Sequence, residues 1–169
     1  MYQKIMIPLD GSELAECVLP HAEAFIRGGM AKTAVFLWVL EPLPMAMYGA
    51  SVETFASSAQ EDIFASNAEY WEKMGAERKS TAEEYLNRIA GPFKQYGTEI
   101  KCEILEGRIA ETLANYAEKN NVDLLLIATH GRSGVSRWLI GSVADRVLHY
   151  SHVPVLMIRA PGSKPTSND

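Results

Sequence analysis

Residues 122–128 have the sequence VDLLLIA and form the most hydrophobic segment of this 169-residue chain. A short run that is apolar at successive positions is typical of a strand buried on both faces, as parallel strands beneath helices are. A loop with several glycines follows at 129–141, and a helix is expected from about Ser142 to Ser151. The segment therefore predicts a buried strand, a glycine-containing loop and a helix start in direct succession.

Four further strands are expected along the chain. Three of them are apolar at nearly every position, whereas the strand at 98–105 alternates Glu and Lys with Ile and Cys. That alternation is typical of a strand with one wet face or of a strand at a sheet edge. The four strands are expected at residues 5–9, 33–40, 98–105 and 153–158.

Helices are expected between the strands, where apolar residues recur every three or four positions. Pro20 lies inside the first helix and is expected to kink it. A long helix is expected from Ile63 until Gly91, after an irregular loop at 42–62 to which we assign no role. The positions at helical spacing are Leu14, Val18, Ala22 and Phe25 in the first helix; Trp71, Met74, Arg78, Ala82, Tyr85 and Ile89 in the long amphipathic helix; and Ile109, Leu113, Tyr116 and Ala117 in the next. In the last helix Val143, Val147 and Leu148 are expected to face inward.

The alternating order of strands and helices predicts the fold class. It indicates an α/β fold with an open five-stranded parallel sheet and helices on both faces. With 47% apolar and 22% charged residues, the chain has the composition of an ordinary soluble protein. We expect one domain at residues 1–160, followed by a polar, flexible tail at 161–169.

Charge and composition exclude several classes of function. Twenty-one acidic residues against 16 basic ones give a net charge of −5, which argues against non-specific nucleic-acid binding. No run of about 18 apolar residues is present, so no membrane span is expected. Cys17 and Cys102 are far apart and lack a CxxC partner, which predicts reduced thiols in a cytoplasmic protein.

Two strand ends carry the candidate site, because ligands of such sheets bind beyond the carboxyl ends of strands where the strand order reverses. Asp10 follows the first strand, and Gly131-Arg132-Ser133-Gly134 follows the fourth and leads to Gly141-Ser142. Glycine amides and a helix N-terminus attract anions, so this loop predicts a phosphate site opposite a carboxylate. The alternative is that Asp10 only caps a turn and that the glycines only form turns.

Other sites are weaker candidates. A GxGxxG motif after the first strand is absent, and Gly141-Ser142-Val143 lacks the lysine of a P-loop. Ser133 misses the GxSxG spacing of hydrolases by one position, so it is a poor nucleophile candidate. His149 and His152 are three residues apart, as in a metal pair, but their position favours the C-terminal end of a helix. No metal site is therefore expected.

The sequence resembles the universal stress protein family from Met1 to about Arg159. The resemblance is carried by IMIPLDGSE near the start, by ILEGRIAETLANYA, and above all by THGRSGVSRWLIGSVADRVLHYSHVPVLMIR. In the nucleotide-binding branch the loop pattern is Gly, two residues, Gly, nine residues, then Gly and Ser or Thr. Gly131 and Gly141-Ser142 match this pattern, whereas Ala128 occupies the position of its first glycine.

The resemblance implies a Rossmann-like sheet of order 3-2-1-4-5 and a site for an adenine nucleotide. The ligand implied is ATP, or AMP or another adenine nucleotide, optionally with Mg²⁺. The residues implied for ribose and adenine are Pro8, Leu9, Asp10 and Val39, flanked by Ile127 and Ala128. The residues implied for the phosphates are Gly131, Arg132, Gly141, Ser142 and Val143.

The resemblance also implies a role in stress response or signalling as a homodimer. Val153–Ile158 is apolar on both faces and would form an exposed sheet edge, which favours pairing with a second copy. No general base is evident, so the chain is expected to show at most weak ATP hydrolysis. The alternatives are a nucleotide-free dimeric interaction module and a slow ATPase or phosphotransferase.

Overall fold

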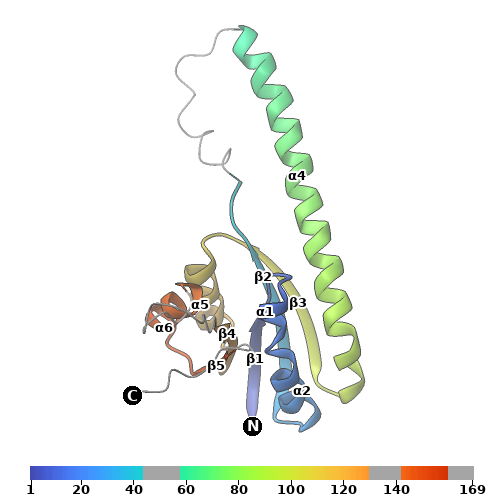
Figure 1. The fold of residues 1–169 in the computed structure, drawn as a ribbon, viewed down its shortest axis with the longest axis vertical. Coiled ribbons are helices and arrows are strands. Elements are labelled where there is room, and N and C mark those ends of the chain that lie inside the picture. The colour runs from blue at the N-terminus through green and yellow to red at the C-terminus, as the bar shows by residue number, and fades with distance from the viewer. Residues whose placement is uncertain (44–57, 130–141, 160–169) are drawn as a thin grey trace, which may run out of the picture.

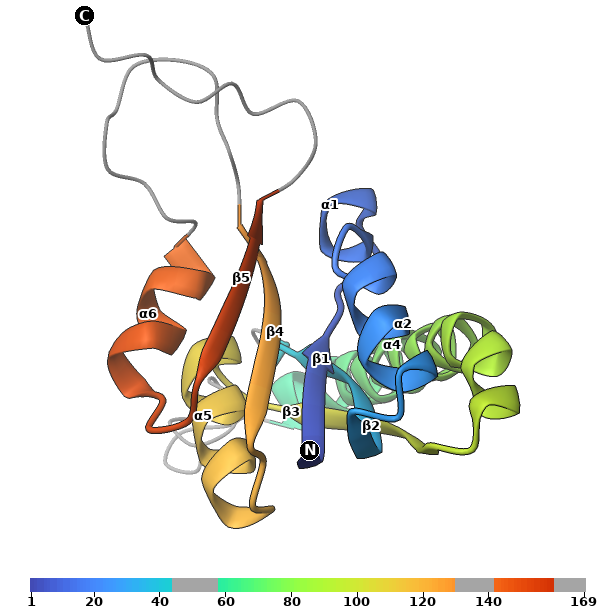
Figure 2. The same ribbon diagram turned by 90° about the horizontal axis from the view of Figure 1, so that it is seen from below.

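Five strands form one parallel sheet in the order β3-β2-β1-β4-β5 (Figures 1 and 2). The structure is a computed structural model that describes residues 1–43, 58–129 and 142–159. The fold class and strand order expected from the sequence are confirmed. The strands are β1 (Tyr2–Pro8), β2 (Ala31–Leu40), β3 (Glu99–Glu106), β4 (Leu124–Thr129) and β5 (Val155–Arg159).

Helices cover both faces of the sheet. Figure 2 shows α1, α2 and α4 on one face and α5 and α6 on the other. The chain crosses from one face to the other after β3, which places the reversal of strand order between β1 and β4. The helices are α1 (Glu13–Glu16), α2 (Leu19–Arg27), α4 (Ser58–Ala90), α5 (Ile109–Lys119) and α6 (Ser142–Tyr150), with a 3₁₀ helix at Gly91–Tyr96.

The central strand is apolar on both faces because it separates two cores. Ile5 and Ile7 belong to the core beneath α1, α2 and α4, and Met6 belongs to the core beneath α5 and α6. All three side chains are fully buried. Each such side chain contributes about 1.5–3 kcal/mol relative to exposure, which explains why β1 and its neighbours have so few polar residues.

The alternation of residues along β3 follows from its position at the sheet edge. Ile100, Cys102 and Ile104 pack against the core beneath α4. Glu99 and Lys101 are exposed, and their side chains form a 3.2 Å ion pair. The prediction of an edge strand with one wet face is therefore confirmed.

The predicted kink at Pro20 is wrong, because the chain forms two helices where we expected one. Ser12 caps α1, which ends at Glu16, and α2 begins at Leu19. Pro20 lies in the first turn of α2. Backbone N–H groups in a first turn have no partner within the helix, so proline costs nothing there.

The long helix begins earlier than predicted. α4 starts at Ser58, so the part of the expected irregular loop at 58–62 is helical. The sequence there is SAQED, which has no apolar period to reveal a helix. Ala82, Leu86 and Ala90 bury the C-terminal part of α4 against the sheet. Figure 1 shows the N-terminal part extending far beyond the sheet.

The inward face of α6 also differs from the prediction. Ala144 and Val147 are buried, whereas Leu148 is 36% exposed. Positions 144 and 147 are three apart and lie on one helix face, and that face packs against the α5 side of the sheet.

None of the helices in the described ranges is both long and apolar enough to cross a membrane.

Candidate functional site

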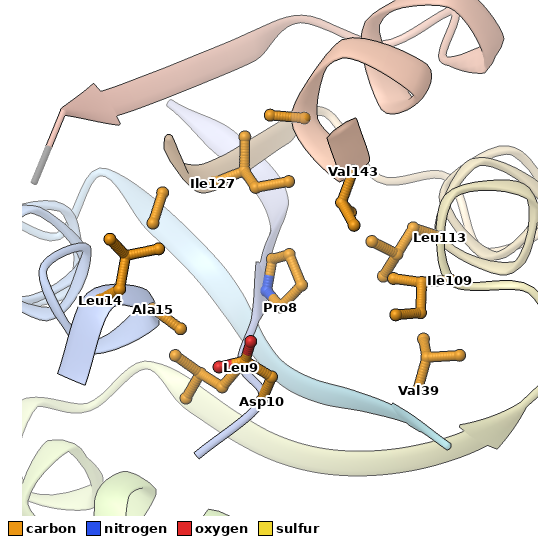
Figure 3. Close-up of a pocket in the computed structure, with 12 residues that line it drawn as sticks. Pro8, Leu9, Asp10, Leu14, Ala15, Val39, Ile109, Leu113, Ile127 and Val143 are labelled. Carbon is orange, nitrogen blue, oxygen red and sulfur yellow. The ribbon is translucent and has the colours of Figure 1, made fainter. Parts of the chain in front are cut away.

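A pocket lies at the carboxyl ends of β1 and β4, the strands between which the strand order reverses (Figure 3). We call it the switch-point pocket. Its cavity volume is about 150 Å³, roughly ten times the space that one water molecule requires. Sheets of this kind bind their ligands at this position. The lining residues are Pro8, Leu9, Asp10, Leu14, Ala15, Val39, Ile109, Leu113, Ile127, Ala128, Val143 and Ala144.

A tight turn after β1 forms the acidic rim of the pocket. Asp10 Oδ1 accepts a hydrogen bond of 3.0 Å from the backbone N–H of Ser12 and one of 2.6 Å from the Ser12 hydroxyl. Ser12 Oγ accepts one of 3.1 Å from the N–H of Ala15, which caps α1. Gly11 has φ of +79°, the left-handed conformation that the turn requires. The Asp10 side chain is thus fixed through one oxygen, and no described residue donates to the other.

Apolar side chains from three elements form one wall (Figure 3). Val39 comes from the end of β2, and Ile109 and Leu113 are one turn apart on α5. Val143 from α6 continues this wall toward Ile127 of β4. A pocket with apolar walls and few polar groups at the rim favours a ligand with an apolar body and a few polar groups.

The N-terminus of α6 lies at the same pocket. α6 begins at Ser142, and Val143 and Ala144 of its first turn line the cavity. The first N–H groups of a helix lack partners within the helix and carry partial positive charge, so they attract anions. The predicted residues Gly131, Arg132 and Gly141, which precede this helix, lie outside the described residues.

A larger hollow of about 680 Å³ adjoins the pocket and shares Ile109 and Val143 with it. Its other lining residues carry charges of both signs, among them Glu41, Arg108 and Arg146. Arg108, which directly precedes α5, already forms a 3.3 Å ion pair with Glu111 of that helix, and its side chain is 82% exposed. The hollow therefore favours neither anions nor cations.

Most of the site residues expected from the sequence meet at the switch-point pocket. Those that line it are Pro8, Leu9, Asp10, Val39, Ile127, Ala128 and Val143. The sequence analysis missed five lining residues, which are Leu14, Ala15, Ile109, Leu113 and Ala144. Ile109 and Leu113 were assigned to a helix face, and a signal was available: α5 follows a parallel strand, so its first turn must start at the same sheet edge.

Metal ligation finds no support in the described residues. No group of three or more His, Cys, Asp or Glu side chains lies close enough together there to hold a metal ion. His149 Nδ1 lies 2.8 Å from the backbone oxygen of Asp145, one turn earlier in α6. This ring therefore lies in the last turn of α6, where the sequence analysis expected it.

A parallel sheet with helices on both faces and a pocket at its switch point defines a Rossmann-like α/β domain. Residues 1–159 match the Universal stress protein family, and the chain belongs to that family. Universal stress protein MJ0531 of Methanocaldococcus jannaschii is 30% identical over 95% of this chain and 84% of the relative. Universal stress protein MJ0577 of the same organism is 29% identical over 96% of this chain and 98% of the relative.

Solved structures agree with this assignment. The structure of MJ0577 has a TM-score of 0.72 at 25% identity and covers 96% of this chain and 99% of its own. A universal stress protein in complex with cAMP has a TM-score of 0.58 at 19% identity, covering 94% of this chain and 97% of its own. A family protein from Arabidopsis thaliana with AMP bound has a TM-score of 0.61 at 15% identity, covering 97% and 96%. At these identities the last two show the shared fold.

Proposed function

We propose that this universal stress protein binds an adenine nucleotide, ATP in the first place, in the switch-point pocket. One observation carries the proposal: Asp10 at the rim and the first turn of α6 line the same apolar cavity, on opposite sides of it. A carboxylate suits ribose hydroxyls, apolar walls suit a purine, and a helix N-terminus suits phosphate. Structures of the same fold with AMP and with cAMP support the same ligand class.

The proposed contacts follow the chemistry of each part of the ligand. Asp10 accepts hydrogen bonds from the ribose through the carboxylate oxygen that Ser12 leaves unused. Val39 and Ile109 pack on the adenine ring. Ser142 and the N–H of Val143 bind phosphate oxygens, together with Gly131, Arg132 and Gly141 from the preceding loop.

In this proposal Mg²⁺ binds only together with the triphosphate. The described residues hold no cluster of three candidate ligands, and Asp10 is the one acidic residue that lines the pocket. Mg²⁺ prefers an octahedral set of oxygens and commonly keeps water and phosphate ligands. The phosphates and water therefore supply most of its coordination, and no catalytic role is assigned to it.

We further propose that the protein works in the cytoplasm as a homodimer, in stress response or signalling. β5 pairs with β4 along one side and forms the end of the sheet in the described strand order. Met157 is 41% exposed on this edge strand. An apolar edge with unpaired backbone groups favours pairing with an identical strand around a twofold axis.

Denaturing the purified protein and analysing the released small molecules by mass spectrometry tests the nucleotide proposal. We expect about one adenine nucleotide per chain, or saturable ATP binding by calorimetry if purification removes it. The variant Gly141→Val serves as the site control, because a branched side chain before α6 blocks phosphate from the helix amides. No nucleotide and no binding would favour the interaction module, and turnover lost in Gly141→Val would favour the ATPase or phosphotransferase.

A further inference from the structure

Trp38 contacts the rim of the switch-point pocket at Gly11 without lining the cavity. A Cβ atom added to Gly11 would lie only 2.7 Å from Cη2 of Trp38. The edge of the indole therefore contacts the backbone of the turn at the residue that follows Asp10. Because the ring lies this close to the backbone, a shift of the indole toward Gly11 displaces the turn.

Tyr85 of α4 contacts both Trp38 and the helix that follows the turn. Its ring packs edge-on against Trp38, with centroids 5.2 Å apart and an angle of 84° between the planes. Its hydroxyl donates a 3.0 Å hydrogen bond to Oε1 of Glu16 in α1. The guanidinium of Arg88 lies 5.2 Å from the centre of the same ring. Tyr85 thus connects α4 to Trp38, which contacts the Asp10–Ser12 turn, and to α1, which follows that turn.

The electrostatics agree with a neutral, donating hydroxyl at this point. Burial, together with the hydrogen bond to the Glu16 carboxylate, raises the pKa of Tyr85 well above its usual range. The negative charge of Asp10 acts in the same direction, so the rim carboxylate and the Tyr85 hydroxyl interact electrostatically. The fully buried contacts of α4 come from Ala82, Leu86 and Ala90, whereas Tyr85 packs against the same core as a partly buried residue.

We propose that Trp38 and Tyr85 are positioning residues, which hold the Asp10–Ser12 turn in its ligand-binding arrangement and thereby couple α4 to the pocket. This proposal rests on the proposed nucleotide site. Coupling of this kind is reciprocal. A ligand that orders the turn stabilises the contact between Trp38 and Tyr85. A partner that moves α4 changes the affinity for the ligand by the same factor by which the ligand changes the affinity for that partner.

Hydrogen exchange on the ligand-free protein tests the structural link. We expect Tyr85→Ala to speed exchange of the Ser12 and Ala15 amides about tenfold, since an aromatic pair and a hydrogen bond are lost. The Leu125 amide, which donates to Pro154 at 2.9 Å, reports overall stability and serves as the internal reference. Tyr70→Ala is the matched control, because Tyr70 lies on the same helix and is 55% exposed.

Tyr85→Phe separates the two interactions of the tyrosine. It keeps the ring against Trp38 and loses only the hydroxyl, so we expect it to restore most of the slow exchange. Equal acceleration at Ser12 and Leu125 in Tyr85→Ala, or the same acceleration in Tyr70→Ala, would overturn the link between α4 and the turn.

ATP binding tests the functional half. We expect affinity to fall about tenfold in Tyr85→Ala, within the range typical of coupled sites, and to stay unchanged in Tyr70→Ala. In a Trp71→Phe, Trp138→Phe background, ATP should change the emission of Trp38, and Tyr85→Ala should diminish that change. If the wild-type protein binds no adenine nucleotide, the proposed function is overturned. The hydrogen-exchange result still decides whether Tyr85 links α4 to the Asp10–Ser12 turn. ATP binding that is unchanged in folded Tyr85→Ala overturns the positioning role.

Discussion

The backbone N–H of Leu125 donates a 2.9 Å hydrogen bond to the carbonyl of Pro154. Leu125 is also the register partner of Val155. In an evenly spaced parallel ladder, this bond turns the backbone groups of residues 154, 156 and 158 toward β4. The N–H groups of Val155 and Met157 therefore point away from the sheet, where a second copy would pair.

This orientation predicts different outcomes for two proline substitutions in β5. Met157→Pro removes an outward N–H and should weaken homodimerisation at least about tenfold while the fold remains, because edge strands tolerate proline. Leu156→Pro removes an inward N–H and with it a ladder hydrogen bond, so it should destabilise the fold by about 1–3 kcal/mol. Sedimentation velocity and urea unfolding measure the two effects. A wild-type protein that sediments as a monomer at micromolar concentration contradicts the dimer.

Gly11→Ala should destabilise the protein by about 2–4 kcal/mol, because the new methyl group meets Trp38 and the backbone is left-handed. Gly97→Ala is the matched control. Gly97 has φ of +81° and nothing within 4 Å of the added Cβ, so only the conformational cost of about 1–2 kcal/mol applies. Urea unfolding gives both values, and equal losses would show that the indole yields without cost.

Asp10→Asn should weaken ATP binding about tenfold and leave the fold intact. The amide oxygen of asparagine can still accept the hydrogen bonds from Ser12 that hold the turn. The variant removes the charge, and with it the stronger hydrogen bond to a ribose hydroxyl. Calorimetry with ATP measures the effect, and circular dichroism controls for folding. Full affinity in the folded variant would argue against a ribose contact at Asp10.

Ala128→Gly should leave ATP affinity unchanged or tighten it modestly. Ala128 lines the pocket at the end of β4, and glycine there restores the family's loop pattern and removes a methyl group from the ligand's path. Glycine also adds backbone entropy to the unfolded chain, so a small loss of stability accompanies the change. A clear loss of affinity in a stable variant would reveal a contact made by the Ala128 methyl group.

Stability should fall as the pH rises above about 10, the ordinary pKa of tyrosine. The pKa values of Tyr85 and Tyr116 are raised in the folded protein, for both chiefly by burial. The folded state then holds these protons more tightly than the unfolded state, so their contribution is complete below pH 10 and is lost above it. Tyr85→Phe should flatten the decline in urea unfolding between pH 9 and pH 11, whereas Tyr70→Phe should not.

Much of the fold could be predicted because the residue composition of each strand reflects whether one or both of its faces are buried. Met6 and its neighbours in β1 are apolar on both faces because they separate two cores, and β3 alternates because one face is wet. The start of α4 was missed because SAQED gives no periodic signal. Leu148 was wrongly assigned to the buried face of α6, because tertiary contacts as well as spacing determine which face is buried.

The site was predictable where it is made of strand ends and less so where helices supply it. Asp10 follows directly from the carboxyl end of β1, and Val39, at the end of β2, was implied by the family resemblance. Leu14 and Leu113 come from helices whose apolar faces also serve the core, so sequence spacing does not separate the two uses. The contact between Trp38 and Gly11 has no sequence signature, because it depends on how β2 and the turn meet in space.

Because α4 is long, a small tilt at the contact between Tyr85 and Trp38 produces a large displacement at the N-terminal end of the helix. From Tyr85 to the start of the helix at Ser58 there are 27 residues, or ~40 Å of rigid rod at 1.5 Å per residue. A rod of that length moves its far end by ~0.7 Å for each degree of tilt at Tyr85. Rotations of the indole too small to alter the sheet would thus produce the largest displacement at the tip and a smaller one at Tyr70, where an attached dye would register it.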